Sequence, residues 1–158
     1  MKWGFRMRIR NSAKAVVVKE GNLLALKIQG NSGAFYVLPG GGQEHGETLH
    51  EALQRECMEE LGVTVEIGDL LFVREYIGRN HEFSAFHSDV HQTEFLFSCT
   101  VMENEITNGS NPDKGQIGAE WIPVHQLMDY NLFPQALRAH LILYSNDEKE
   151  LTYVGDIN

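Results

Sequence analysis

Apolar residues follow a strand-like pattern in the first forty positions of the chain. Two short aliphatic runs, 15–18 and 23–28, flank Gly21-Asn22, a dipeptide that favours a tight turn. The pattern therefore predicts two strands around a turn within residues 12–29. A third apolar run and a Pro-Gly-Gly-Gly segment follow, and they predict a strand over 35–38 and a loop over 39–42.

The next segment has the apolar period of a helix. Its apolar residues recur at spacings of 3, 1, 4 and 4, which places them on one helical face. Gly62 follows, and glycine commonly ends a helix in the left-handed conformation. We therefore predict a helix from Thr48 to Leu61. The apolar face consists of Leu49, Ala52, Leu53, Cys57 and Leu61.

Beyond this helix, apolar strands alternate with polar loops, and helical segments come last. The predicted strands are 63–76, with a break near Gly68-Asp69, 95–101 and 117–123. The predicted loops are 78–91 and 104–115, and the predicted helices are 124–129 and 134–144, the second with Pro134 at its start. This order of elements favours an α/β (α+β) sandwich over a doubly wound sheet.

Composition is typical of a folded globular chain, and we expect a single domain over residues 1–158. The net charge of −9 argues against a surface that coats a nucleic-acid polymer, but it allows a nucleotide held through a metal ion. The apolar runs are too short to cross a membrane, and no secretory signal is evident. We therefore expect a cytoplasmic protein, in which Cys57 and Cys99 form no disulfide framework.

Residues 39–63, PGGGQEHGETLHEALQRECMEELGV, combine a glycine segment with an acidic helix. Glycines allow the backbone to approach a ligand closely, and the helix N-terminus that follows favours an anion. Glu56 and Glu60 share one face of the predicted helix with Glu59 on its flank, so their carboxylates repel one another. Hard oxygen ligands favour Mg²⁺ or Mn²⁺. The alternative is a solvated acidic face, which is common for such a short motif alone.

The spacing of the fixed residues resembles the Nudix box of the Nudix (MutT-like) pyrophosphohydrolase family. Gly41 is followed after five residues by Glu47, and after seven more by the run 55–63, Arg-Glu-Cys-Met-Glu-Glu-Leu-Gly-Val. Cys57 departs from the aliphatic residue usual at its position. The later segment Gly115 to Trp121 also resembles the family. The resemblance implies a Nudix-type α/β/α sandwich with a mixed β-sheet.

The resemblance also implies a reaction, namely Mg²⁺- or Mn²⁺-dependent cleavage of the pyrophosphate bond in a nucleoside diphosphate linked to another moiety. The expected metal ligands are Glu56, Glu59, Glu60 and the carbonyl of Gly40. Glu56 or Glu59 is the expected general base, and Glu47 and Arg55 are expected to organise the catalytic site. The guanidinium of Arg55 can hold a carboxylate such as Glu47 by a bidentate pair. The alternatives are a catalytically silent Nudix domain that binds a nucleotide as a regulatory module, and a non-enzymatic metal-binding scaffold. The intact box argues against the silent domain.

Further residues are expected on the substrate side. The candidate substrate-binding residues are Gly41, Gly42, Arg74, Asp113 and Glu120, although Asp113 also suits a turn and Glu120 an exposed strand position. His81, His87 and His91 cluster in one loop, where we favour a substrate-side role over a zinc site because paired cysteines are lacking. The expected partner is a phosphorylated small molecule, with no nucleic-acid polymer and no membrane. A homodimer is compatible with the family.

Overall fold

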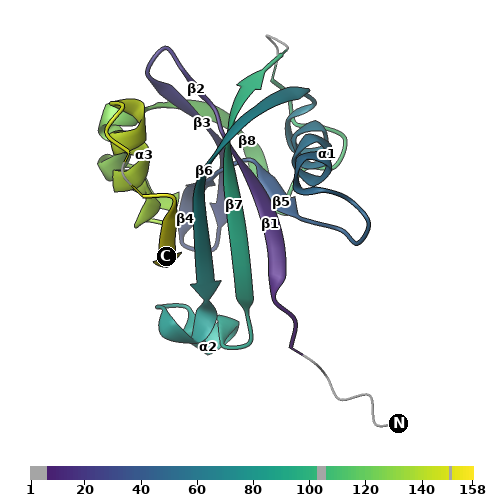
Figure 1. Cartoon of the computed structure of the whole chain (residues 1–158), viewed down its shortest axis with the longest axis vertical. Helices are drawn as coiled ribbons and strands as arrows, with labels where there is room; N and C mark the ends of the chain where they lie inside the picture. The colour runs from purple at the N-terminus through teal and green to yellow at the C-terminus, as the bar shows by residue number, and fades with distance from the viewer. Residues whose placement is uncertain (1–6, 103–105, 150) are drawn as a thin grey trace.

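The chain forms two twisted β-sheets between helices, as a computed structural model that describes residues 7–102, 106–149 and 151–158 shows (Figure 1). The strands are β1 (Arg10–Val16), β2 (Val18–Lys19), β3 (Asn22–Gly30), β4 (Gly33–Val37), β5 (Gly40–Gly42), β6 (Val65–Ile77), β7 (His91–Val101), β8 (Gln116–Pro123), β9 (Leu132–Phe133) and β10 (Tyr153–Asp156). The helices are α1 (Leu49–Leu61), α2 (Ser84–His87) and α3 (Leu137–Ser145), and the 3₁₀ turns are η1 (Gly78–Asn80) and η2 (Val124–Asp129).

The first sheet has the strand order β10-β6-β7-β1-β5 and mixes parallel with antiparallel pairs. Strand β1 is central to the site because it pairs parallel with β7 and antiparallel with β5, so that Ser12 lies opposite both Glu94 and Gly42. The second sheet has the order β2-β3-β4-β9, and β8 pairs with β3. The expected mixed sheet is therefore confirmed.

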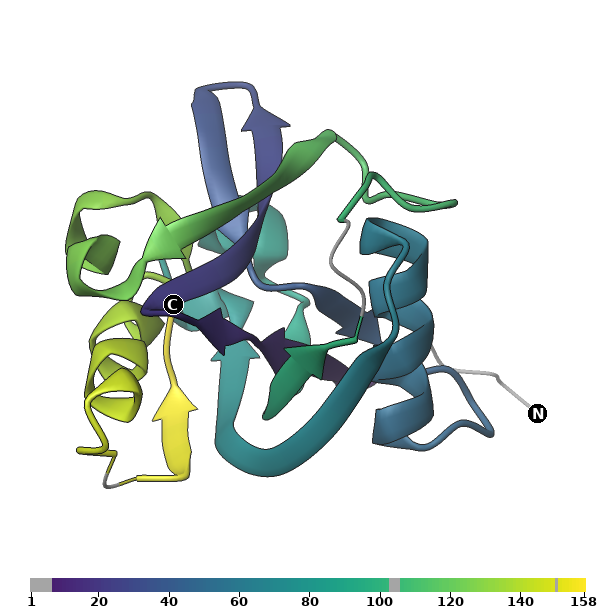
Figure 2. The same cartoon turned by 90° about the horizontal axis from the view of Figure 1, so that it is seen from above.

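The two core clusters lie on opposite sides of the sheets. The apolar face of α1, including Leu53 and Cys57, packs in one cluster with alternate residues of β1 and β3. Leu137 and Leu141 of α3 pack in the other cluster against the opposite faces. Figure 2 shows the resulting layers, with α1 and α3 at opposite sides of the strands. This is the α/β/α sandwich that the family resemblance implies.

The predicted helix is confirmed, and local chemistry explains both of its ends. Thr48 accepts a hydrogen bond from the backbone of Glu51, whose side chain bonds back to the backbone of Thr48, a reciprocal capping box. Gly62 ends the helix in the left-handed conformation at φ 66°. The helix start is therefore fixed immediately after the glycine segment.

The predicted loop over 39–42 is wrong in part, because Gly40–Gly42 form strand β5 on the edge of the first sheet. Glycine has a low intrinsic strand preference, so local sequence gives no sign of this strand, which is defined by its pairing with β1. The predicted break near Gly68-Asp69 is a shift in register between β6 and β7 within a continuous β6. Such a shift bends a strand without ending it.

Other boundaries also differ. The predicted loop 78–91 contains η1 and α2, where the backbone of His87 bonds to Phe83, and β7 begins at His91. The predicted helix 124–129 is the 3₁₀ turn η2, and α3 begins three residues after Pro134. The short strands β9 and β10 are additional. In the part of the chain that the structure describes, no helix is long and apolar enough to cross a membrane.

Candidate active site

Arg55 donates hydrogen bonds to three acidic side chains of the candidate site. Its Nε and Nη2 atoms donate to the two carboxylate oxygens of Glu47 at 3.1 and 2.7 Å, the expected bidentate pair. Nη2 also donates to the carbonyl of Gly42 at 3.0 Å. Nη1 donates to Glu56 at 2.9 Å and to Glu59 at 3.4 Å. The hydrogen bond from Arg55 and then that from the backbone of Glu44 lower the pKa of Glu47.

Glu60 is the buried carboxylate of α1, with 1% of its surface exposed. Its Oε2 accepts a hydrogen bond from the backbone N–H of Gly40 at 2.9 Å, while Oε1 has no hydrogen-bond partner among the described residues. Burial raises the pKa of Glu60 to about 8, although the charge of Lys14 and the Gly40 hydrogen bond oppose the rise. The sequence placed Glu60 beside Glu56 on one helical face, and the contact with the backbone of Gly40 distinguishes the buried Glu60.

The three glycines of β5 leave no room for side chains. A Cβ on Gly40, which has φ 125°, would lie 2.1 Å from the carbonyl oxygen of Ala13. A Cβ on Gly41 would lie 2.6 Å from the carboxyl carbon of Glu56, and one on Gly42 would meet the guanidinium of Arg10. The acidic helix α1 therefore packs directly on the backbone of β5 at Gly41.

Lys14 is a site residue that the sequence analysis missed. Its Nζ donates to the carbonyl of Gly40 at 3.1 Å, so Gly40 lies between Lys14 and Glu60. The available signal was a single lysine within the otherwise apolar run of Ala13 to Val18. A positive charge at this backbone carbonyl places a phosphate-attracting group beside the acidic helix.

The donor atoms suit a hard divalent cation. Glu60 offers a buried oxygen without a partner; Glu56 lies nearby, as does the Gly40 carbonyl, which accepts from Lys14 in this structure. Within the described ranges, no three His, Cys, Asp or Glu side chains converge in a metal-binding geometry, because Glu56 and Glu59 face Arg55. The donor chemistry thus fits Mg²⁺ or Mn²⁺, with Arg55 contacting Glu56 and Glu59 in this arrangement.

A loop that follows β7 closes the carboxyl end of α1. The backbone N–H groups of Thr107, Gly109 and Asn111 donate to the carbonyls of Leu61, Glu60 and Glu59 at 3.1, 3.0 and 2.9 Å. These carbonyls have no partner within the helix itself. The side chain of Gln116 adds a bond to the Glu60 carbonyl at 2.7 Å. Figure 2 shows this loop beside the end of α1.

Asp113 and Glu120, the two candidate carboxylates that follow α1 in the chain, have different surroundings. Asp113 lies in the turn before β8, where its backbone exchanges hydrogen bonds with Gln116, and its charge contributes to the raised pKa of Glu60. Glu120 accepts hydrogen bonds from Lys27 at 3.0 Å and Tyr36 at 2.8 Å, which lower its pKa. Among the described residues, no hydrogen bond or ion pair joins Glu120 to α1. Metal or substrate contacts by either residue stay predictions.

Arg74, a candidate substrate ligand, is buried in a pair with Glu94. Its Nε donates to Glu94 at 2.5 Å and its Nη1 to the carbonyl of Ile157 at 2.7 Å. Only 6% of Arg74 and 5% of Glu94 are exposed. Burial alone would raise the pKa of Glu94. The charges of Arg74 and Lys14 outweigh that effect, so the pKa of Glu94 lies below its usual value. A role of Arg74 in substrate binding stays a prediction.

The three histidines of the 78–91 segment have separate partners. His81 pairs with Asp156, His87 with the hydroxyl of Tyr76, and His91 with Glu75. Phe83 and His87 line a largely apolar pocket of about 680 Å³ with aromatic residues from other elements. The other aromatic lining residues are Phe35, Tyr76 and Phe133.

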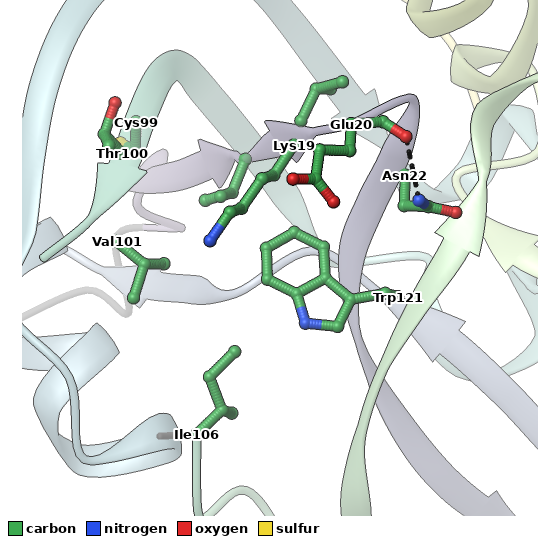
Figure 3. A pocket seen from close by; sticks show the side chains of 10 residues that line it. Lys19, Glu20, Asn22, Cys99, Thr100, Val101, Ile106 and Trp121 are labelled. Carbon is green, nitrogen blue, oxygen red and sulfur yellow. Dashed lines mark hydrogen bonds between the residues drawn. The ribbon is translucent and has the colours of Figure 1, made fainter. Parts of the chain in front are cut away.

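The aromatic pocket, defined by those five residues, shares one lining residue with a hollow beside Lys14. Phe133 lines both this pocket and a small hollow of about 60 Å³ that Lys14 also lines. A different pocket, of about 500 Å³, surrounds Trp121 beside Lys19 and Glu20 (Figure 3). It lies by the β2–β3 turn, and its lining contains none of the predicted site residues. The aromatic pocket contains His87, one of the three histidines expected on the substrate side, and through Phe133 it shares a lining residue with the hollow beside Lys14.

Comparison with known proteins agrees with this geometry. A family model for the NUDIX domain matches residues 8–142. The nucleoside triphosphatase NudI of Enterobacter sp. (strain 638) is 42% identical over 112 residues, which are 64% of this chain and 75% of that protein. NudI of Salmonella agona (strain SL483) is 29% identical over 131 residues, or 80% of this chain and 90% of that protein.

Solved structures share the fold. A NUDIX hydrolase from Nitrosomonas europaea superposes with a TM-score of 0.71 at 18% identity, covering 96% of this chain and 80% of that chain. A MutT NUDIX hydrolase from Burkholderia pseudomallei gives 0.61 at 23% identity, covering 75% of this chain and 85% of that chain. At these identities the likeness concerns the arrangement of helices and strands.

Proposed function

The chain belongs to the NUDIX family, whose domain model it matches over residues 8–142, and we propose that this pyrophosphohydrolase cleaves the pyrophosphate bond of a nucleoside diphosphate linked to another moiety. The observation that carries the proposal is the packing of α1 on β5. There Glu60 is buried against the Gly40 N–H with one carboxylate oxygen unpartnered, and Arg55 holds Glu47, Glu56 and Glu59 beside it.

Nucleoside triphosphates are the first substrates to test, because relatives that cover most of this chain are named nucleoside triphosphatases. In such a substrate the phosphate chain would lie at the acidic helix, and the base would enter the aromatic pocket. Phe83 and Phe133, whose rings are 5.9 Å apart, offer apolar faces for it. The pocket volume of about 680 Å³ falls within the range typical of small-molecule sites.

The chain's own residues would divide the work of hydrolysis. Lys14 would attract the phosphate chain toward β5, and Arg55 would hold Glu47 and thereby fix the start of α1. Glu56 or Glu59 would take the proton from the attacking water. The side chain of Glu59 is 30% exposed and that of Glu56 is 15% exposed, so we assign the role of general base to Glu59.

Glu56, Glu59, Glu60 and the carbonyl of Gly40 would hold Mg²⁺ or Mn²⁺. A bound ion would supply charge neutralisation at the phosphate oxygens and a more acidic water. The unpartnered oxygen of Glu60 is the feature of this chain that supports metal binding, because a buried carboxylate oxygen without a donor is costly unless something occupies it.

The test is a substrate panel with the purified full chain and Mg²⁺ or Mn²⁺. Nucleoside triphosphates, ADP-ribose, nucleotide sugars and dinucleoside polyphosphates would be assayed for release of phosphate and pyrophosphate. We expect Glu59→Gln to lower kcat by about a hundredfold or more. Glu66→Gln, which changes an exposed glutamate on β6, is the matched control and should keep full activity.

The outcomes separate this proposal from the silent-domain alternative. Metal-dependent turnover that is lost in Glu59→Gln and kept in Glu66→Gln supports the hydrolase. Tight Mn²⁺ binding without turnover of any compound favours a regulatory nucleotide-binding module instead. Failure to bind Mn²⁺ would overturn the metal site proposed on α1.

A further inference from the structure

We propose that the C-terminal strand β10 holds the wall of the aromatic pocket in place, and that Asp156 is the positioning residue through which it acts. The NUDIX domain match ends at residue 142, so β10, over Tyr153–Asp156, lies beyond the matched region. The substrate consequence rests on the proposed function, because it assumes that the aromatic pocket receives the base. The positioning of the pocket wall by Asp156 does not depend on the proposed function.

Asp156 joins β10 to the segment that carries the pocket wall. Its Oδ1 accepts hydrogen bonds from the backbone N–H of Ile77 at 2.9 Å and from Nε2 of His81 at 2.5 Å. Its Oδ2 accepts a third from the side-chain amide of Asn80 at 2.8 Å. One carboxylate thus holds three consecutive parts of the chain between β6 and α2: the last residue of β6, η1 and the residue that follows η1.

The contact continues from His81 into the pocket. The His81 ring stacks on Tyr76 with 5.3 Å between ring centroids and 17° between their planes. The Tyr76 hydroxyl is 2.9 Å from Nδ1 of His87, and His87 lies against Phe83. Tyr76, His87 and Phe83 all line the pocket. Asp156 is therefore connected to the wall through one intermediate side chain.

The residues after β10 provide a second connection. Asn158 lines the pocket and donates from its side-chain amide to Glu82 at 3.0 Å. The carbonyl of Ile157 accepts from Arg74 at 2.7 Å, and the backbone of Ile157 donates to the carbonyl of Glu75. The end of β10 is thereby fixed to β6 on one side and to the pocket segment on the other.

The experiment compares Asp156→Asn with Asp129→Asn in the full chain. Asparagine has one acceptor oxygen, so it cannot accept the three hydrogen bonds that Asp156 receives. Asp129 is an exposed aspartate at the end of η2 and serves as the matched control. Two quantities would be measured: amide hydrogen exchange of residues 78–90 without ligand, and KM and kcat for whichever of dATP, dCTP, dGTP and dTTP wild type hydrolyses best.

We expect faster exchange over residues 78–90 in Asp156→Asn, with KM raised about fivefold to tenfold and kcat changed less than about twofold. Tyr76→Phe keeps β10 intact and removes only the hydroxyl bond to His87, so it should raise KM by about threefold. Asp129→Asn should change none of these quantities. A fall in kcat at unchanged KM would overturn the proposal, because it would indicate an effect on the chemistry rather than on the pocket.

The two proposals fail in different ways. If wild type hydrolyses none of the four nucleotides, these four are excluded as substrates, and the exchange measurement still decides whether Asp156 positions the segment. If wild type is active but Asp156→Asn matches Asp129→Asn in exchange and KM, the positioning role of Asp156 is overturned while the hydrolase proposal stands.

Discussion

The backbone N–H of Gly40 donates to Oε2 of the buried Glu60 at 2.9 Å, across 20 residues of sequence. This bond joins the glycine strand β5 to the acidic helix α1. The same glycine also lies so close to β1 that a Cβ on Gly40 would meet the backbone of Ala13 and Lys14.

Gly40→Ala should therefore destabilise the fold. The new Cβ would lie 2.1 Å from the carbonyl oxygen of Ala13, at a residue whose φ of 125° already disfavours a side chain. We expect a loss of about 3 kcal/mol or more in the free energy of unfolding, measured by urea denaturation. Gly118→Ala, with nothing within 4 Å of its Cβ, should change stability by less than about 1 kcal/mol. Equal losses in both variants would contradict the prediction.

Arg55→Lys should reduce turnover although it keeps the charge. A lysine ammonium cannot bond at once to both oxygens of Glu47 and to the Gly42 carbonyl, so the start of α1 loses its fixed orientation. We expect kcat/KM to fall about tenfold or more. Arg138→Lys alters an arginine that bonds to backbone carbonyls near η2, and it should retain activity. Full activity of Arg55→Lys would show that the bidentate contact between the Arg55 guanidinium and Glu47 is dispensable.

The Arg74–Glu94 pair should make stability depend on acidity. The folded pKa of Glu94 lies below its ordinary value of 4.5, whereas unfolding restores that value. As the pH falls, Glu94 therefore becomes protonated in the unfolded chain before it does in the folded protein. The stabilisation from the ionised pair is complete above about pH 4.5 and disappears as the pH falls through the lower folded pKa.

Glu94→Gln gives the corresponding measurement. At neutral pH the variant should be less stable by about 3 kcal/mol, because it leaves the buried Arg74 without its counter-charge. The difference from wild type should shrink in urea titrations as the pH falls below 4.5 and through the lower folded pKa, where Glu94 becomes protonated in both states. The exposed control Glu66→Gln should show no such convergence. A constant deficit at every pH would contradict the assignment.

Gly109→Ala should loosen the carboxyl end of α1. Its Cβ would lie 2.3 Å from the Glu59 carbonyl oxygen, so the loop must move away from the helix that it closes. We expect a loss of about 1–3 kcal/mol in the free energy of unfolding and weaker Mn²⁺ binding by titration calorimetry. Ser110→Ala, a change at the next and exposed position, should leave both values unchanged. Unaltered Mn²⁺ affinity in Gly109→Ala would separate this loop from the metal site.

Sequence patterns predicted the features that depend on nearby residues. The ends of α1 follow from Thr48 and Gly62, and the pairing of Arg55 with Glu47 follows from the arginine's fork. These interactions span at most eight residues, so the chemistry of the segment determines them.

The features that were missed depend on distant partners. Strand β5 exists because β1 supplies its hydrogen bonds, although three glycines have little preference for a strand. Glu60 is buried because β5 covers it, and spacing along the helix cannot distinguish it from Glu56 in this respect. Strand β10 consists of four residues that pair with β6, far back in the chain. Lys14 becomes a site residue only when Gly40 lies beside it.

The position of β1 between β5 and β7 also sets an order of events during synthesis. One edge of β1 can pair as soon as Gly42 has been made, but its other edge awaits Glu94 and the residues around it. The residues of the acidic helix α1 are all synthesised before β7, so the sheet against which the helix packs forms later. Such distant parallel pairing slows folding. A ribosome-bound chain that ends before β7 should therefore carry a finished α1 and an unfinished site.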